Sequence, residues 1–263
     1  MTRKGLAIAF LFLAVGCVTM PETGKRVLIL TSESEENQMG VQAYQEVLRK
    51  ERTSKDARLN TILQRVGDRI KKVANRPDYQ WQFTLIDSKE QNAFCLPGGK
   101  VAFYTGILPI AQNEAGIATV MGHEVAHATQ RHGGQRITQS MGTQVGLAAL
   151  TGILGGRDSS EKRLLLGALG MGATVGVILP FSRDNESEAD EVGLKYMAAA
   201  GYDPREAVAF WDRFAKATGV KGPPAFLSTH PSSKGRMEAL QRDLPKVEGA
   251  YVSSPKYGAG EKL

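Results

Sequence analysis

Apolar residues recur at three- and four-residue steps over much of the chain, and this spacing predicts a mainly helical protein. Helices are expected over residues 41–50, 58–74, 204–217 and 232–243. The second of these has the plainest apolar face, which is formed by Leu59, Ile62, Leu63, Val66, Ile70 and Val73. Lysine and arginine lie on the opposite face, as expected for helices that pack around a core.

Other segments show the two-residue alternation that is typical of half-buried strands. Residues 81–87 read WQFTLID, and residues 101–104 follow a turn at residues 97–99. Residues 27–30 form a shorter apolar patch that is also expected to be a strand. The chain therefore belongs to the α+β class and is mainly α, with a small antiparallel sheet before residue 114.

The N-terminus has a basic start, an apolar run over residues 6–15 and a cysteine at position 17. Residues 14–17 resemble a bacterial lipoprotein cleavage box, so residues 1–16 are expected to be a signal peptide and Cys17 to carry lipid. An ordinary signal peptide or a short membrane anchor is the alternative. Because Val18 rather than aspartate follows the cysteine, we expect a lipid-anchored protein of the cell envelope, at the outer membrane and facing the periplasm.

A second apolar run, residues 164–181, contains no charge in 18 residues and reaches the length of a membrane span. It also contains four glycines and ends at Pro180-Phe181, so a buried or cleft-covering helix pair explains it better than a membrane helix.

The composition fits one globular domain, since the 263 residues are 42% hydrophobic and 23% charged. The net charge is +6, but no basic cluster is interleaved with aromatic residues, so nucleic acid is not expected as a partner. We expect a tether over residues 17–40, the domain over 41–245 and a flexible tail over 246–263. If Cys17 is lipidated, Cys95 has no intramolecular disulfide partner and is expected to be a small packed residue.

One segment carries most of the chemistry. His123, Glu124 and His127 form an H-E-x-x-H pattern within a run of good helix formers. Residues four apart lie on the same face of a helix, so the two histidines can bind one zinc ion, and Glu124 lies where it can take a proton from water. A five-residue pattern can also arise by chance, so a further ligand is needed to support a site.

A catalytic zinc ion takes three protein ligands and leaves one position open. His132 is one candidate, but the metzincin pattern requires glycine at position 130 and histidine at position 133, where this chain has Gln130 and Gly133. His132 is therefore expected to be a helix-end residue.

A glutamate on a later helix is the other common solution. Glu186 and Asp190 are four residues apart in the segment FSRDNESEADEVG. Glu186 could bind the metal, and Asp190 could accept a hydrogen bond from a ligand histidine and fix its tautomer. A solvated acidic face is the alternative, although apolar residues beside it favour a helix that docks on the core.

These segments together resemble a family. GHEVAH, SRDNESEADEVG, NAFCLPGGKVAFYTGIL and Thr229-His230-Pro231 with Arg236 are similar to the gluzincin-type zinc peptidases that include the HtpX, Oma and BepA proteases and the CAAX prenyl proteases. The resemblance covers about residues 41–245 and is greatest to bacterial envelope lipoproteins. It implies a gluzincin-like fold with a small antiparallel sheet beside the metal helix.

The resemblance also implies roles for individual residues. One zinc ion per chain would be bound by His123, His127 and Glu186, with Glu124 as the general base and Asp190 behind the ligands. His230 would lie over the metal, where it would stabilise the oxyanion or occupy the open ligand position in a resting state.

An edge strand runs beside the metal helix in zinc peptidases of this kind and holds the substrate backbone as an added strand. Asn92, Ala93 and Phe94 are the candidates here, and an ordinary hairpin is the alternative. The expected function is a zinc endopeptidase that cleaves unfolded or misfolded envelope polypeptides. Its rivals are a membrane-embedded protease like HtpX, a chaperone-like quality-control binder whose zinc is blocked by His230, and a zinc hydrolase that is not a peptidase.

Overall fold

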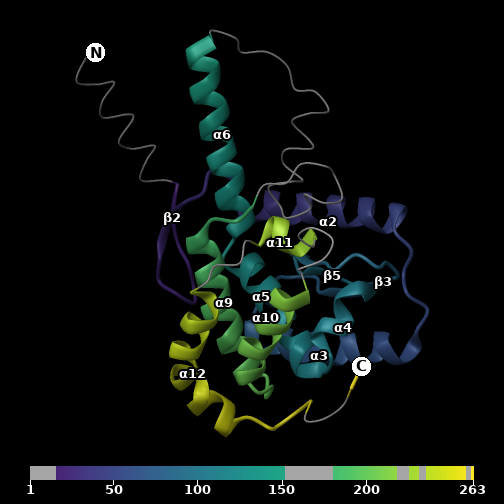
Figure 1. The fold of residues 1–263 in the computed structure, drawn as a ribbon. Coiled ribbons are helices and arrows are strands. Elements are labelled where there is room, and N and C mark those ends of the chain that lie inside the picture. The colour runs from purple at the N-terminus through teal and green to yellow at the C-terminus, as the bar shows by residue number, and fades with distance from the viewer. Residues whose placement is uncertain (1–15, 152–179, 218–224, 231–234, 259–261) are drawn as a thin grey trace.

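The fold is mainly helical with two small sheets, which confirms the α+β class (Figure 1). The computed structural model describes residues 16–151, 180–217, 225–230, 235–258 and 262–263. The strands are β1 (Cys17–Thr19), β2 (Arg26–Leu28), β3 (Gln82–Ile86), β4 (Ala93–Leu96) and β5 (Lys100–Tyr104). The helices are α2 (Glu33–Lys50), α3 (Ala57–Ala74), the 3₁₀ turn η1 (Thr105–Ile107), α4 (Leu108–Ala111), α5 (Glu114–Thr129), α6 (His132–Thr151), α9 (Arg183–Ala199), α10 (Arg205–Ala217), α11 (Ala225–Thr229) and α12 (Arg236–Ser253).

The larger sheet has the strand order β3-β5-β4, so β4 is an edge strand. β4 and β5 form an antiparallel hairpin, in which Phe94 pairs with Ala102. β3, however, runs parallel to β5, so the prediction of a purely antiparallel sheet is wrong for this strand. Alternation of apolar and polar residues shows that a segment is a strand but does not specify its partner or its direction.

Helices cover both faces of this sheet, because successive side chains of a strand point to opposite sides. Phe94, Leu96 and Tyr104 pack with residues of α2 on one face. Cys95 and Phe103 belong to the larger cluster on the other face, which includes α3 and α5. As a result α5 lies inside the molecule, with α3, α9 and α10 packed around it (Figure 1).

Helix α5 is buried along its whole length. Its first turn is fixed by Asn113, whose side chain accepts a hydrogen bond from the backbone N–H of Gly116 at 2.8 Å. Glu114, which is also in this turn, forms ion pairs with Arg65 and Arg69 of α3. A carboxylate suits the positive end of a helix dipole, and the two arginines offset its burial.

Helices α5 and α9 approach closely where each has a glycine. A Cβ atom on Gly122 would lie 2.7 Å from the carbonyl oxygen of Gly193, and a Cβ atom on Gly193 would lie 2.8 Å from the backbone nitrogen of His123. Real Cβ atoms essentially never make contacts this short. Glycine at both positions therefore brings the two backbones together beside the first metal-helix histidine.

The ends of the chain differ in part from the expectation. β1 and β2 form an antiparallel hairpin, and α2 begins at Glu33 with a capping box between Ser32 and Glu35. At the other end α12 continues to Ser253, so residues 246–253 are helical rather than part of a flexible tail. The domain boundaries themselves remain predictions.

Two predicted segments fall mainly outside the described residues, namely the signal peptide over 1–16 and the apolar run over 164–181. Among the helices of the described part of the chain, none combines the length and the apolar character that a membrane crossing requires.

We expect Gly193→Ala to destabilise the protein. Alanine in a helix normally stabilises by about 1 kcal/mol relative to glycine, but here the added methyl group would push α9 away from α5 at a cost of roughly 1–3 kcal/mol. The measurement is the free energy of unfolding in urea. Gly249→Ala is the matched control, because no atom lies within 4 Å of its added Cβ in α12, and it should stabilise. A gain in stability for Gly193→Ala would contradict the close-crossing argument.

Candidate metal centre

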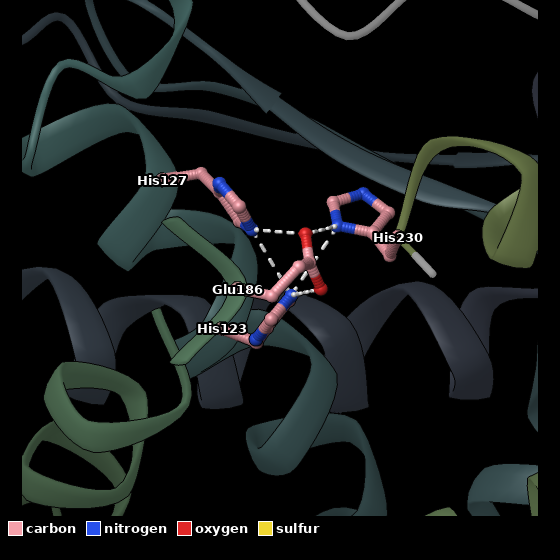
Figure 2. Close-up of side chains that lie close together, drawn as sticks. All are labelled: His123, His127, Glu186 and His230. Atoms are coloured by element: carbon pink, nitrogen blue, oxygen red, sulfur yellow. Dashed lines mark hydrogen bonds and ion pairs between the residues drawn. The ribbon is translucent and has the colours of Figure 1, made fainter. Parts of the chain in front are cut away.

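Four side chains from three parts of the chain converge on one point (Figure 2). His123 and His127 come from α5, Glu186 from α9, and His230 from the residue that follows α11. One potential ligand atom from each lies within 4.8 Å of the others. The Nε2 atoms of His123 and His127 are 3.1 Å apart, and His230 Nδ1 is 3.0 Å from Glu186 Oε1. All four side chains are buried.

The sequence positions these groups in a simple way. His123 and His127 are four residues apart, so the helix places both rings on one face. Glu186 lies in the first turn of α9, which begins after the cap residue Ser182. Glu186 and Gly193 are seven residues apart and share one face of α9, so the close crossing at Gly193 also brings the carboxylate to the histidines. Glu186 Oε1 is 3.3 Å from His127 Nε2.

Glu186 and His127 are in the protonation states that a metal ion requires, whereas His123 must release a proton before it can bind one. Burial raises the pKa of Glu186, but the neighbouring histidines outweigh this effect and hold the pKa well below its usual range, so the carboxylate is charged. Burial keeps the pKa of His127 well below its usual value, so this ring is neutral. Burial and Arg236 lower the pKa of His123, but hydrogen bonds to Asp190 and Glu186 raise it to about 9. Imidazole nitrogens with one carboxylate oxygen are a donor set that zinc accepts.

Glu124 lies beside this group, as the H-E-x-x-H pattern predicts. Its side chain is buried, and its Oε1 atom is 3.4 Å from His230 Nε2. Within the described residues, Oε1 has no hydrogen-bond partner. Burial raises the pKa of Glu124, although the positive character of His230 and His123 opposes the shift. A buried, unpartnered acceptor next to a metal-type cluster is suited to accept a proton from water.

Asp190 takes the position expected from its spacing. Its Oδ1 atom lies 3.0 Å from His123 Nδ1, the ring nitrogen that faces away from the cluster. Arg236 of α12 donates to Asp190 Oδ1 at 2.6 Å and to Glu186 Oε2 at 3.1 Å. Its guanidinium stacks on Trp211, 3.4 Å from the ring centroid. One arginine therefore holds both carboxylates, a role that the sequence did not assign to it, since nothing in the local pattern shows which acids it reaches.

His132 is at a helix end, as predicted, because it begins α6. It is also fully buried, and its Nδ1 atom is 2.9 Å from His127 Nδ1. Two residues that are five apart do not normally lie on the same face of a helix, but the helix is interrupted between α5 and α6. Arg131 has a φ of 51°, in the left-handed region, and this turn brings His132 back to His127. The sequence analysis missed this contact because the turn depends on tertiary packing: Arg131 forms a buried ion pair with Glu36 of α2.

His230 occupies the fourth ligand position in this arrangement. Its Nδ1 atom lies 3.3 Å from His123 Nε2 and 3.0 Å from Glu186 Oε1. Phe226 of α11 stacks on the His230 ring, with ring centroids 4.5 Å apart. A catalytic zinc site needs one open position. His230 therefore lies where a fourth ligand would lie, and both its oxyanion role and its resting-state role stay predictions.

Ala93 and Phe94 lie in β4, which is the edge strand of the larger sheet, and their role in substrate binding stays a prediction. The backbone N–H of Tyr104 donates to the Asn92 carbonyl, so Asn92 faces β5. Because antiparallel bonding alternates, the backbone of Phe94 also faces β5, whereas the backbones of Ala93 and Cys95 face outward. Of the three predicted residues only Ala93 has an outward-facing backbone, and the backbone N–H of Cys95, which also faces outward, is bonded to the Glu124 carboxylate.

Comparison with known proteins agrees with this site. Residues 57–243, more than half of the chain, match peptidase family M48. The chain belongs to peptidase family M48. It is 38% identical over 228 residues to the mitochondrial metalloendopeptidase OMA1 of Schizosaccharomyces pombe, covering 84% of this chain and 65% of that protein. It is 36% identical over 184 residues to the Saccharomyces cerevisiae protein of the same name, covering 66% and 50%.

A bacterial protein is also similar. The beta-barrel assembly-enhancing protease of Escherichia coli strain K12 is 29% identical over 244 residues, covering 90% of this chain and 49% of that protein. The chain thus spans about one half to two thirds of the length of these three relatives.

These M48 relatives overturn the predicted location. The mitochondrial proteins of both yeasts have higher percentage identity to this chain (38% and 36%) than the bacterial protease (29%), so the prediction of a lipid-anchored protein at the outer membrane is wrong. The motifs that suggested it describe the chemistry of the metal site, which is the same in either compartment. The N-terminal pattern, which also suggested it, lies almost wholly outside the described residues.

We expect the affinity for zinc to distinguish the metal ligands from the residues that orient those ligands. Glu186→Gln removes the anionic ligand and should abolish stoichiometric zinc binding. Asp190→Asn leaves all ligands in place and should weaken zinc binding by roughly 10–100-fold, as is typical for groups that orient a ligand histidine. Titration with zinc against a chelating dye measures both. Equal affinities in the two variants would contradict this assignment.

Proposed function

We propose that this M48 protein is a zinc-dependent endopeptidase that hydrolyses peptide bonds in unfolded or misfolded polypeptide segments. The observation that carries the proposal is the position of Glu124, a buried carboxylate beside the group His123, His127 and Glu186, with one oxygen that accepts no hydrogen bond from the described residues. The names of the relatives, metalloendopeptidase and protease, support the same reaction class.

Different side chains of the site have different roles in the proposed hydrolysis. A bound zinc ion would polarise the scissile carbonyl and lower the pKa of a water molecule to about 7. Glu124 accepts the proton of the attacking water and returns it to the leaving amine. Its raised pKa favours the first of these transfers, because a carboxylate that holds a proton more tightly than an exposed glutamate is a better base. Asp190 and Arg236 keep His123 and Glu186 in place during both steps.

The edge strand supports extended substrates. The backbone N–H of Cys95 faces the Glu124 carboxylate, so the outward side of β4 runs directly past the proposed base. A peptide that paired with Ala93 would run along this side of β4 and place its backbone beside Glu124. A folded substrate cannot present a free strand in this way, which is why we propose unfolded or misfolded segments as the substrate class.

His230 supports a second candidate function, that of a quality-control binder held inactive. Its ring fills the fourth ligand position, and the N–H of Phe226 on the same short helix donates to the Gln91 carbonyl just before the edge strand. One displacement of α11 would therefore free both the metal and the start of the substrate strand. We propose that this arrangement is the resting form of the protease.

Glu124→Gln should retain one zinc ion per chain and lose at least about a hundredfold in activity, since proton transfer by a positioned side chain contributes about 10²–10⁴-fold. Casein cleavage and zinc content measure the two properties. Glu191→Gln, an exposed change on α9, is the matched control and should behave as wild type. Equal rates of casein cleavage by the wild type and Glu124→Gln would contradict the proposed mechanism.

His230→Ala should increase casein cleavage several-fold, because it opens the fourth ligand position while three ligands remain. Zinc content is measured in parallel and should stay at one per chain. A fall in activity at full zinc content would instead assign His230 to stabilisation of the oxyanion and would exclude the resting-state role.

A further inference from the structure

A line of buried polar groups leads away from His127 on the side opposite the metal cluster. His127 Nδ1 lies 2.9 Å from His132 Nδ1. His132 Nε2, at the far side of that ring, lies 3.5 Å from Glu188 Oε2. His132 is 0% exposed and Glu188 is 7% exposed. The hydrolytic mechanism uses neither residue.

The positions of the ring protons follow from the geometry. His127 Nε2 faces His123 and Glu186, so a ligand lone pair must be on Nε2 and the ring proton on Nδ1. A contact of 2.9 Å between two nitrogens needs one donor and one acceptor. His127 Nδ1–H therefore donates to His132 Nδ1, and the proton of a neutral His132 is on Nε2, facing Glu188.

Glu188 is itself held in place by the N-terminal hairpin. Thr23 Oγ1 donates to Glu188 Oε1 at 2.6 Å, and Lys25 Nζ lies 3.0 Å from Glu188 Oε2. Both residues belong to the turn between β1 and β2. The separation of 3.5 Å between Glu188 and His132 is at the limit of a hydrogen bond, and His132 Nε2 has no closer hydrogen-bond partner in the described part of the chain.

We propose that His132 is a positioning residue that fixes the tautomer and orientation of the metal ligand His127, and that Glu188, with Thr23 and Lys25, holds His132 in place. The proposal rests on the metal centre proposed above. His132 serves His127 as Asp190 serves His123: each ligand ring has an acceptor on the nitrogen that faces away from the cluster. The N-terminal hairpin is thereby linked to metal binding through Glu188.

Three variants test this assignment. His132→Leu keeps an apolar side chain of moderate size and removes the acceptor. His132→Asn can place its amide oxygen close to the position of Nδ1 and so restore an acceptor. Gln135→Leu is the matched control on the same helix, because it breaks a buried hydrogen bond between α6 and Asn185 of α9 but touches no ligand.

The measurements are the zinc dissociation constant by chelator competition, the absorption spectrum of the Co(II)-substituted protein, and thermal unfolding of the metal-free protein. His132→Leu should raise the dissociation constant about 10–100-fold and change the Co(II) spectrum. His132→Asn should recover most of the affinity. Gln135→Leu should lower the melting temperature and leave both metal readouts at wild-type values.

The outcomes separate this proposal from the proposed function. If the wild type binds no zinc, the metal centre fails and this inference fails with it. If the wild type binds zinc and His132→Leu matches it, or if His132→Asn is no better than His132→Leu, the positioning role alone is overturned. Should His132→Leu not fold, Glu188→Gln replaces it: a several-fold weaker zinc affinity supports the role, and an unchanged affinity and Co(II) spectrum overturn it.

Discussion

The close crossing of α5 and α9 is the contact on which the metal centre depends. Gly122 precedes the first histidine of the H-E-x-x-H pattern, and Gly193 lies two turns after Glu186. Without a side chain at either position, the backbones approach until the Gly193 carbonyl is a near neighbour of Gly122. That approach brings a carboxylate from one helix within 3.5 Å of imidazole nitrogens on the other. Larger residues at the crossing would separate ligands that are correct in type and spacing.

Burial of this group costs free energy, because charged carboxylates and polar imidazoles lose their contacts with water. Glu186 and Asp190 are offset by Arg236, which is itself buried and stacked on Trp211. A buried charge without a partner is strongly destabilising, whereas a group of opposite charges with hydrogen bonds is tolerated. The arginine therefore explains how the fold holds two acids beside a cluster of histidines. It comes from α12, so the C-terminal helix is part of the site.

What the sequence predicted well was local. The spacing of His123 and His127, and that of Glu186 and Asp190, specifies a helix face without any knowledge of the rest of the fold. The parallel pairing of β3 and the contact of His132 with His127 could not be predicted in this way. Strand direction depends on which segments meet in space, and the turn at Arg131 is held by Glu36, almost a hundred residues earlier in the chain. The metal-site motifs identified the chemistry, whereas the compartment was predicted from the N-terminal pattern around Cys17, and that prediction is wrong.

The position of α11 connects binding of substrate with access to the metal. Its Phe226 N–H bonds to Gln91 at the start of the edge strand, and His230 directly after it fills a ligand position. A peptide that extended along β4 would compete for the first contact and would thereby loosen the second. The helix has only five residues, and a helix this short has little stability of its own, so its position depends on these contacts and on packing of Phe226 with Trp211 and Phe214. An extended segment that paired with the edge strand would for this reason displace α11 and open the metal site. A folded chain offers no free strand, so the metal site would stay closed.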